Sequence, residues 1–125
     1  MSADKATPIA MRAEAVLKSY GATRALCNVD FDVFAGAVNV LIGENGAGKS
    51  TLMRILAGVE RPDGGQVFLS GEPTSFTGVR DAARRGVGIV FQELNLCPNL
   101  SVLENIFLGR RITHGPLIDA AAERA

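Results

Sequence analysis

Polar and apolar side chains alternate in the first third of the chain, which is typical of strands with one buried face. Residues 28–33 read Asn-Val-Asp-Phe-Asp-Val and have the two-residue period of such a strand. Residues 12–19 are a weaker candidate for a second strand, and residues 21–23 contain a glycine that would turn the chain between the two. The pattern therefore predicts antiparallel sheet, preceded by a loose start over residues 1–11.

Two later segments, residues 37–42 and 88–91, are apolar almost without interruption. Short runs of this kind are typical of strands that are covered on both faces in a parallel sheet. Residues 66–70 lie between the two runs and alternate again, which predicts a strand with one exposed face.

A helix is predicted after the glycine-rich residues 43–51, which follow the first apolar run. Apolar residues recur at helical spacing over residues 52–59, as Leu52, Ile55, Leu56 and Val59. Gly58 followed by Pro62 predicts where this helix ends.

Further helices are predicted downstream. Residues 79–85 form a short candidate that Gly86 would close. Residues 101–104, Ser-Val-Leu-Glu, match a capping box, in which the serine hydroxyl and the glutamate carboxylate each satisfy an amide at a helix start. Gly109 is expected to end that helix, and Asp119 is a candidate cap for one more.

Residues 43–51, Gly-Glu-Asn-Gly-Ala-Gly-Lys-Ser-Thr, match the phosphate-loop pattern Gly-x4-Gly-Lys-Ser. A chain that wraps around a triphosphate must point several N–H groups inward, which requires positive φ or close approach at Gly46 and Gly48. The following helix adds unpaired amides and the positive end of its dipole. Lys49 would place a cation near the β and γ phosphates, and the Ser50 hydroxyl would occupy one position on Mg²⁺.

The position of this loop, between a buried-strand pattern and an amphipathic helix, favours a phosphate loop over a flexible glycine turn without a ligand. We therefore predict that the chain binds a nucleoside triphosphate, ATP, with Mg²⁺. The loop residues predicted to contact the nucleotide are Gly43, Glu44, Asn45, Gly46, Ala47, Gly48, Lys49, Ser50 and Thr51.

Composition bounds the rest of the interpretation. A chain of 125 residues, 47% hydrophobic, is at most one ordinary domain and is long enough to bury a core. Thirteen basic residues balance thirteen acidic ones, so we expect no nucleic-acid partner and only a local anion site. Cys27 and Cys97 are interpreted as reduced thiols. No apolar run approaches the roughly 20 residues that span a bilayer, so any membrane role would be peripheral.

Two blocks of sequence resemble the nucleotide-binding domains of ABC transporters: GENGAGKSTLMRILAGVERPDGGQVFLSGEP at residues 43–73, and VGIVFQELNLCPNLSVLENIFLGR at residues 87–110. Gln92-Glu93-Leu94 and the helix at residues 104–110 are similar to the ATP-binding subunits of ribose, xylose and galactose importers. The resemblance implies an α/β fold. It would have a P-loop NTPase-type core, with helices on a parallel sheet, and an N-terminal antiparallel β subdomain, and it would be incomplete in this chain.

The resemblance also assigns roles to two residues outside the loop. Gln92 matches the Q-loop glutamine, which contacts Mg²⁺ or the attacking water and moves with the transmembrane partner, so Ser50 and Gln92 are the implied metal ligands. Tyr20 resembles the A-loop aromatic that stacks on adenine. Without the resemblance, Gln92 would be interpreted as a surface polar residue and Tyr20 as core or turn packing.

The parts with which this family hydrolyses ATP do not occur in the sequence. A signature LSGGQ-type segment, a Walker B Asp with its catalytic Glu, a D-loop and a switch His are all missing. Gln92 stands where a Walker B motif would need Asp, and His114 is interpreted as a solvated histidine in a loop. Because phosphoryl transfer depends on positioning and charge stabilisation, we expect this chain alone to bind nucleotide without hydrolysing it. Residues 37–42 would keep exposed faces, so we interpret the sequence as part of a longer domain.

The predicted organisation is a loose N-terminus at 1–11, the N-terminal part of a nucleotide-binding domain at 12–110, and the truncated start of a helical subdomain at 111–125. The function implied by the resemblance is to power monosaccharide import from the cytoplasmic face of the plasma membrane. Implied partners are a transmembrane permease, a second nucleotide-binding domain and, indirectly, a periplasmic sugar-binding protein. A non-enzymatic nucleotide-binding module and a stand-alone P-loop kinase are the alternatives. None of these residues would identify the sugar.

Overall fold

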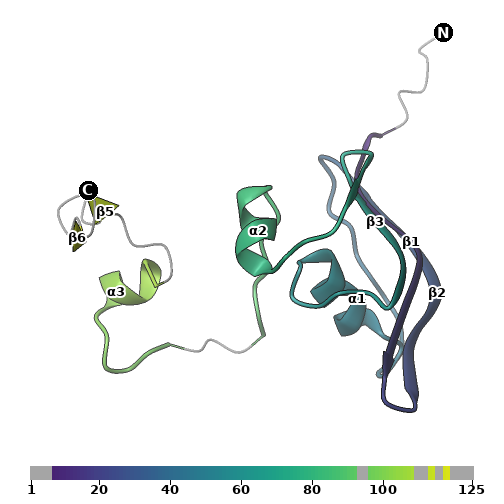
Figure 1. Ribbon diagram of the computed structural model, residues 1–125, viewed down its shortest axis with the longest axis horizontal. Coiled ribbons are helices and arrows are strands. Elements are labelled where there is room, and N and C mark those ends of the chain that lie inside the picture. Colours follow the sequence, from purple (N-terminus) through teal and green to yellow (C-terminus); the bar gives the residue numbers. More distant parts are fainter. Residues whose placement is uncertain (1–6, 93–95, 109–112, 115–116, 119–125) are drawn as a thin grey trace, which may run out of the picture. The chain divides into compact units, whose positions relative to one another are not determined.

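The computed structural model describes residues 7–92, 96–108, 113–114 and 117–118, and the chain divides into two compact units, residues 1–89 and 90–125. Figure 1 shows the elements of each unit. The first unit contains four strands and two helices among its described residues: β1 (Ile9–Tyr20), β2 (Thr23–Phe34), α1 (Lys49–Leu56), β3 (Gly64–Leu69), β4 (Glu72–Thr74) and α2 (Val79–Arg84). The second contains α3 (Val102–Ile106), β5 (Thr113–His114) and β6 (Leu117–Ile118). The subdomain boundary expected between residues 110 and 111 stays a prediction.

The first unit is built on one antiparallel sheet in the order β2-β1-β3-β4. In the long central strand β1, Arg12 lies opposite Asp32 of β2 on one side and Phe68 of β3 on the other. Residues 21 and 22 form the turn between β1 and β2. The antiparallel sheet predicted from the alternation is thus confirmed, although β1 begins at Ile9, inside the segment expected to be loose. The short strand β4 was not predicted.

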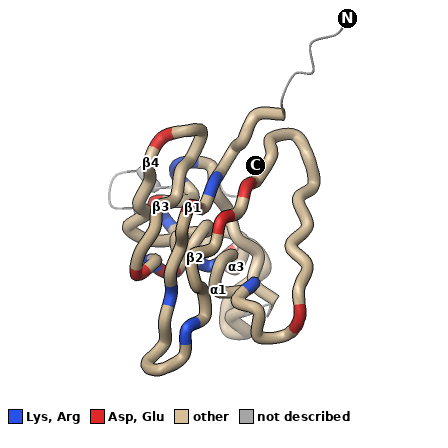
Figure 2. Tube along the Cα trace, turned by 90° about the vertical axis from the view of Figure 1, so that its right-hand side faces the viewer, with Lys and Arg blue, Asp and Glu red and all other residues tan. Residues whose placement is uncertain are grey.

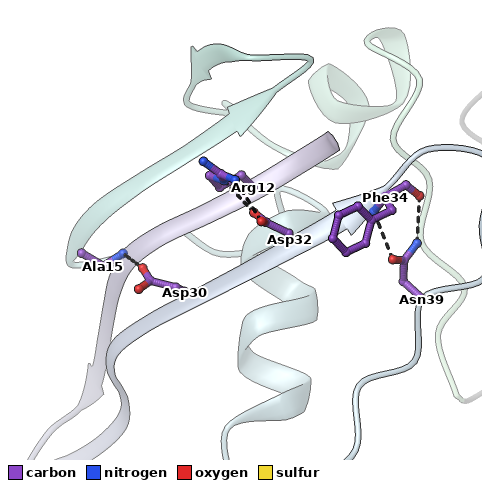
Figure 3. Close-up of polar contacts among 6 residues, drawn as sticks. All are labelled: Arg12, Ala15, Asp30, Asp32, Phe34 and Asn39. Carbon is purple, nitrogen blue, oxygen red and sulfur yellow. Dashed lines mark hydrogen bonds and ion pairs between the residues drawn. The ribbon is translucent and has the colours of Figure 1, made fainter. Parts of the chain in front are cut away.

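Side chains on β2 fasten it to β1, as Figure 3 shows. The Arg12 guanidinium donates to both carboxylate oxygens of Asp32, at 2.6 and 2.9 Å. These bonds hold the pKa of Asp32 below its usual value. Two positions along, Asp30 Oδ1 accepts the N–H of Ala15 at 2.7 Å, at an irregularity in β1 where Ala15 has a φ of +49°. The carboxylate therefore satisfies an amide that the bulge removes from the regular ladder.

Helix α1 packs against β1 and β2, and together they form the core. The core residues come from the strands, from α1, from the segment before α2 and from α2 itself: Met11, Ala13, Val16, Leu26, Leu52, Ile55, Leu56, Val67, Phe76 and Ala82. The predicted helix end is confirmed, because Gly58 adopts a φ of +71°. Its N–H donates to Ile55 and that of Val59 to Arg54, which is a Schellman stop.

The two unbroken apolar runs do not form strands in the described residues. Residues 37–42 have no ladder partner there, and Val38, Val40 and Ile42 are 93%, 70% and 86% exposed. Residues 88–91 are likewise outside any strand, with Val90 92% exposed. The prediction of buried parallel strands is therefore wrong for the described structure. The physical reason is that a strand needs a neighbour to accept and donate its ladder bonds, and none of the described residues supplies one.

Polar contacts define the second unit. The capping box predicted at residues 101–104 is confirmed: Ser101 Oγ accepts the Glu104 N–H at 3.3 Å and the Glu104 carboxylate accepts the Ser101 N–H at 2.9 Å. Asn105 fastens the preceding loop by accepting the Cys97 N–H at 2.8 Å. His114 pairs with Leu117 across a two-residue ladder, so it lies in a strand and not in a loop. The helix end expected at Gly109 and the cap expected at Asp119 lie outside the described residues.

Charged residues of both signs are interspersed along the described chain (Figure 2). Both cysteines are free thiols, Cys27 exposed and Cys97 half-buried. The structure thus agrees with the interpretation of unpaired cysteines.

Candidate functional site

The glycine loop runs into α1, which begins at Lys49. Gly46 and Gly48 have φ values of +85° and +83°, in the region that glycine occupies without strain. At Gly48 a close approach adds to this requirement. A Cβ there would lie 2.6 Å from Leu26 Cδ2 and closer still to the carbonyl oxygen of Ala25. Glycine at position 48 therefore lets the loop pass directly beside β2.

The first turn of α1 presents amides that no side chain caps. Gly48 occupies the N-cap position and has no side chain to accept a hydrogen bond, and the first turn contains no acidic residue. The N–H groups and the positive end of the helix dipole are therefore available to an anion, as the sequence predicts.

Lys49 holds the two ends of the loop together. Its ammonium donates to the carbonyl oxygens of Gly43 at 2.6 Å and Glu44 at 2.5 Å. An ammonium has three donors, so these two bonds keep the cation at the loop while one donor is left for another acceptor.

The two hydroxyl residues that follow face different surroundings. Ser50 is exposed, whereas Thr51 is only 9% exposed. Among the described residues, no group of three or more His, Cys, Asp or Glu side chains gathers into a metal site. Of the two hydroxyls, that of Ser50 is the more accessible to a bound cation.

A pocket of about 330 Å³ opens in front of the loop and joins it to the turn between β1 and β2. Its lining combines Tyr20 and three β2 residues with the loop and the start of α1: Tyr20, Thr23, Arg24, Ala25, Asn45, Gly46, Gly48, Lys49, Ser50 and Thr51. The predicted aromatic residue and six of the nine predicted loop residues are thus brought together. Gly43, Glu44 and Ala47 do not line the pocket.

Sequence reasoning missed Thr23, Arg24 and Ala25. Their only signal is that they follow the Tyr20 turn and open β2, which places them beside the loop once the sheet packs on α1. Gln92 belongs to the second unit, where it is exposed, and its role stays a prediction.

A larger hollow of about 430 Å³ is a poorer candidate for an anion. It is lined by Arg12, Ala13, Glu14, Asp30, Phe31 and Asp32. The single guanidinium there faces three carboxylates and is already bonded to one of them, so the hollow opposes negative charge.

Comparison with known proteins decides the family. The family model described as ABC transporter matches residues 26–125. The chain belongs to the ABC transporter family. This result confirms the resemblance seen in the two sequence blocks, and membership of an ATP-binding cassette family implies nucleotide binding.

Curated relatives of this ABC chain are named as sugar-import subunits. It is 55% identical to ribose import ATP-binding protein RbsA 2 of Streptomyces avermitilis over 78% of this chain and 19% of that protein. It is 51% identical to RbsA 1 of Streptomyces coelicolor, over 86% and 23% of the two chains. A putative ribose/galactose/methyl galactoside import ATP-binding protein of Rhizobium meliloti is 50% identical, over 86% and 22%. The chain therefore spans about a fifth of the length of the curated relatives it matches.

Solved structures give the same fold. A nucleotide-free ATP-binding cassette from an ABC transporter superposes with a TM-score of 0.74 at 28% identity, covering 92% of this chain and 44% of that one. A dimeric post-hydrolysis cassette bound to ADP and Pi gives 0.67 at 28% identity, over 84% and 50%. The fold class predicted from the sequence is confirmed by these cassettes and by the antiparallel N-terminal sheet. Within the described residues, no helix has the length and apolar character needed to cross a bilayer.

Proposed function

We propose that this chain binds Mg·ATP in the pocket between Tyr20 and the glycine loop. The observation that carries the proposal is the pocket itself, because it combines an aromatic ring, uncapped helix amides and an ammonium in one lining. These three groups match the three parts of the ligand: a flat base, anionic oxygens and the concentrated charge at the end of the triphosphate.

The loop residues bind the phosphates and hold their charge. The uncapped amides at the start of α1 face the anion. The Lys49 ammonium exchanges its bonds to the Gly43 and Glu44 carbonyls for phosphate oxygens. That exchange replaces two neutral acceptors with charged ones, and hydrogen bonds between charged partners are the stronger kind. Ser50 is the proposed protein ligand of Mg²⁺ at the loop, where the cation, when bound, would neutralise phosphate charge. The role of Gln92 in the second unit stays a prediction.

Tyr20 supplies the platform for adenine. Tyr20 lines the same pocket as the loop and is 44% exposed, so its side chain is accessible to a base. Thr23 and Arg24 border the space between ring and loop, where the ribose and the first phosphate would lie.

The family and the names of the relatives support a proposal about the larger assembly. We propose that the protein containing this sequence powers monosaccharide import, at the cytoplasmic face of the plasma membrane. It would act with a permease, a second nucleotide-binding domain and a periplasmic sugar-binding protein. Hydrolysis needs the signature, Walker B and switch residues that this sequence lacks, so the 125-residue chain alone is proposed to bind without turnover.

The test is calorimetric titration of the full chain with Mg·ATP. Lys49→Ala removes the ammonium, and a lost bond to a charged group is worth about 1.5–3 kcal/mol, so Kd should rise roughly tenfold to a hundredfold. Arg84→Ala removes an exposed cation on α2 and should leave Kd unchanged. Equal affinity of the wild type and Lys49→Ala would refute the site. Steady ATP turnover above that of Lys49→Ala would refute the claim of binding without hydrolysis.

A further inference from the structure

Tyr20 is hydrogen-bonded to the segment that follows α1. Its hydroxyl donates to Glu60 Oε2, and Glu60 Oε1 accepts a longer bond, 3.4 Å, from the Arg54 guanidinium of α1. The Glu60 side chain is 22% exposed, so it is half-buried where it accepts the phenol hydroxyl. The aromatic ring is therefore tied, through one carboxylate, to the helix that carries the phosphate loop at its other end.

Neighbouring contacts strengthen the same attachment. Lys18 donates to the Arg61 carbonyl at 2.8 Å and to Asp63 Oδ1 at 3.0 Å, while Asp63 Oδ2 accepts the Ser19 N–H at 2.8 Å. Residues 60–63 thus bind three successive residues at the end of β1. This clamp fixes the backbone from which the Tyr20 side chain projects.

Lys18 also determines which face of the ring is available. Its ammonium lies over the Tyr20 ring, 5.7 Å from the centroid. A cation on one face leaves the other as the stacking surface, and the Glu60 bond at the far end of the phenol limits rotation of the side chain. Ring orientation is therefore set before any base arrives.

We propose that Glu60 is a positioning residue that presets Tyr20 as the adenine platform. This inference rests on the proposed nucleotide site. Without the carboxylate, the ring has to lose rotamer freedom when a base stacks on it, and ordering a side chain on binding reduces affinity. With the carboxylate, α1 fixes the platform and the loop relative to each other, because Arg54 and Lys49 belong to the same helix.

The experiment compares two ligands on the full chain: Mg·ATP, and Mg·tripolyphosphate, which has no base. Glu60→Ala should raise Kd for ATP by about threefold to tenfold and leave tripolyphosphate binding unchanged. Glu60→Gln keeps an oxygen acceptor for the phenol and should bind ATP almost as the wild type does. Tyr20→Phe keeps the ring but not the hydroxyl, so its affinity for ATP should fall by as much as that of Glu60→Ala. The affinity of the double variant should fall no further, because both substitutions remove the same bond.

Intrinsic fluorescence gives a second measurement, because Tyr20 is the single tyrosine and the chain has no tryptophan. A carboxylate that accepts a phenol proton quenches tyrosine emission, so Glu60→Ala should be brighter than the wild type, and ATP should quench both by stacking. Equal tyrosine emission from Glu60→Ala and the wild type would refute the hydrogen bond between Tyr20 and Glu60.

Equal ATP affinity of Glu60→Ala and the wild type, or an equal loss for both ligands, would overturn the positioning role. If the wild type binds tripolyphosphate but binds ATP no more tightly, the platform fails while the phosphate loop stands. If it binds neither ligand, the proposed function itself fails.

Discussion

Replacing Gly48 by alanine tests whether β2 shapes the phosphate loop. The substitution adds one methyl group at a residue whose φ is +83°. That methyl would lie 2.6 Å from Leu26 Cδ2 and closer to the Ala25 carbonyl oxygen, and a backbone carbonyl cannot move without displacing β2. The loop, the strand or both must therefore shift.

The expected cost has two parts. A left-handed alanine costs about 1–2 kcal/mol, and forcing a methyl into filled space costs about 1–3 kcal/mol more. Gly46 separates these parts, because its φ is nearly the same, +85°, but nothing lies within 4 Å of the position its Cβ would take. Gly46→Ala should therefore show the backbone cost alone, reduced by the roughly 0.4–1 kcal/mol that alanine gains by restricting the unfolded chain.

Urea denaturation followed by circular dichroism measures the difference. Gly48→Ala should unfold at a urea concentration about 1 M lower than Gly46→Ala, since small proteins lose about 1–3 kcal/mol per molar urea. Equal midpoints for the two variants would show that contact with Ala25 and Leu26 is absent in solution. A midpoint for Gly48→Ala equal to that of the wild type would also refute the left-handed conformation of the residue.

Two further predictions concern stability. Ile55 is 2% exposed, and Ile55→Ala should lower the free energy of unfolding by about 2–5 kcal/mol. A decrease below about 1 kcal/mol, measured by urea denaturation, would contradict the burial of Ile55 between α1 and the sheet. The pKa of Asp63 is lowered by the Ser19 N–H and then by the Lys18 ammonium, so its folded value lies below the unfolded value of about 3.9. Its contribution to stability is complete above about pH 4–5 and is lost as pH falls through the folded pKa. The urea midpoint should therefore fall less between pH 6 and pH 2 for Asp63→Asn than for the wild type. An equal fall for the two proteins would contradict a lowered pKa of Asp63.

Local signals in the sequence predicted local structure well. The capping box at residues 101–104 and the stop at Gly58 depend on contacts a few residues apart, so the pattern contains all the information they need. The prediction of a buried strand at residues 37–42 was wrong, because an apolar run shows only that a strand there could be buried. Whether it forms depends on ladder partners far along the sequence, and the described residues provide none.

In the candidate site, too, the contiguous motif could be predicted from the sequence, whereas the contacts between distant residues could not. The phosphate loop is a contiguous motif, and the positive φ values of Gly46 and Gly48 agree with what the motif requires. Tyr20 entered only through resemblance to a family. Glu60 had no signal at all, because its contact with the phenol joins positions 40 residues apart that meet only after β1 packs beside the end of α1.

The antiparallel sheet helps to shape the phosphate loop. The start of β2 lines the pocket, and its Ala25 carbonyl and Leu26 side chain occupy the space in which a Cβ of Gly48 would lie. Leu26 is also buried in the core with Leu52 of α1, so the strand packs against both Gly48, the N-cap residue, and the helix that follows it. Residues 37–42 precede the loop directly, yet three of their side chains are at least 70% exposed. Closely packed neighbours constrain a loop's conformation, so the conformation of this loop depends on β2 and α1. Substitutions in β2 should therefore alter nucleotide affinity more than substitutions at Val38 or Val40.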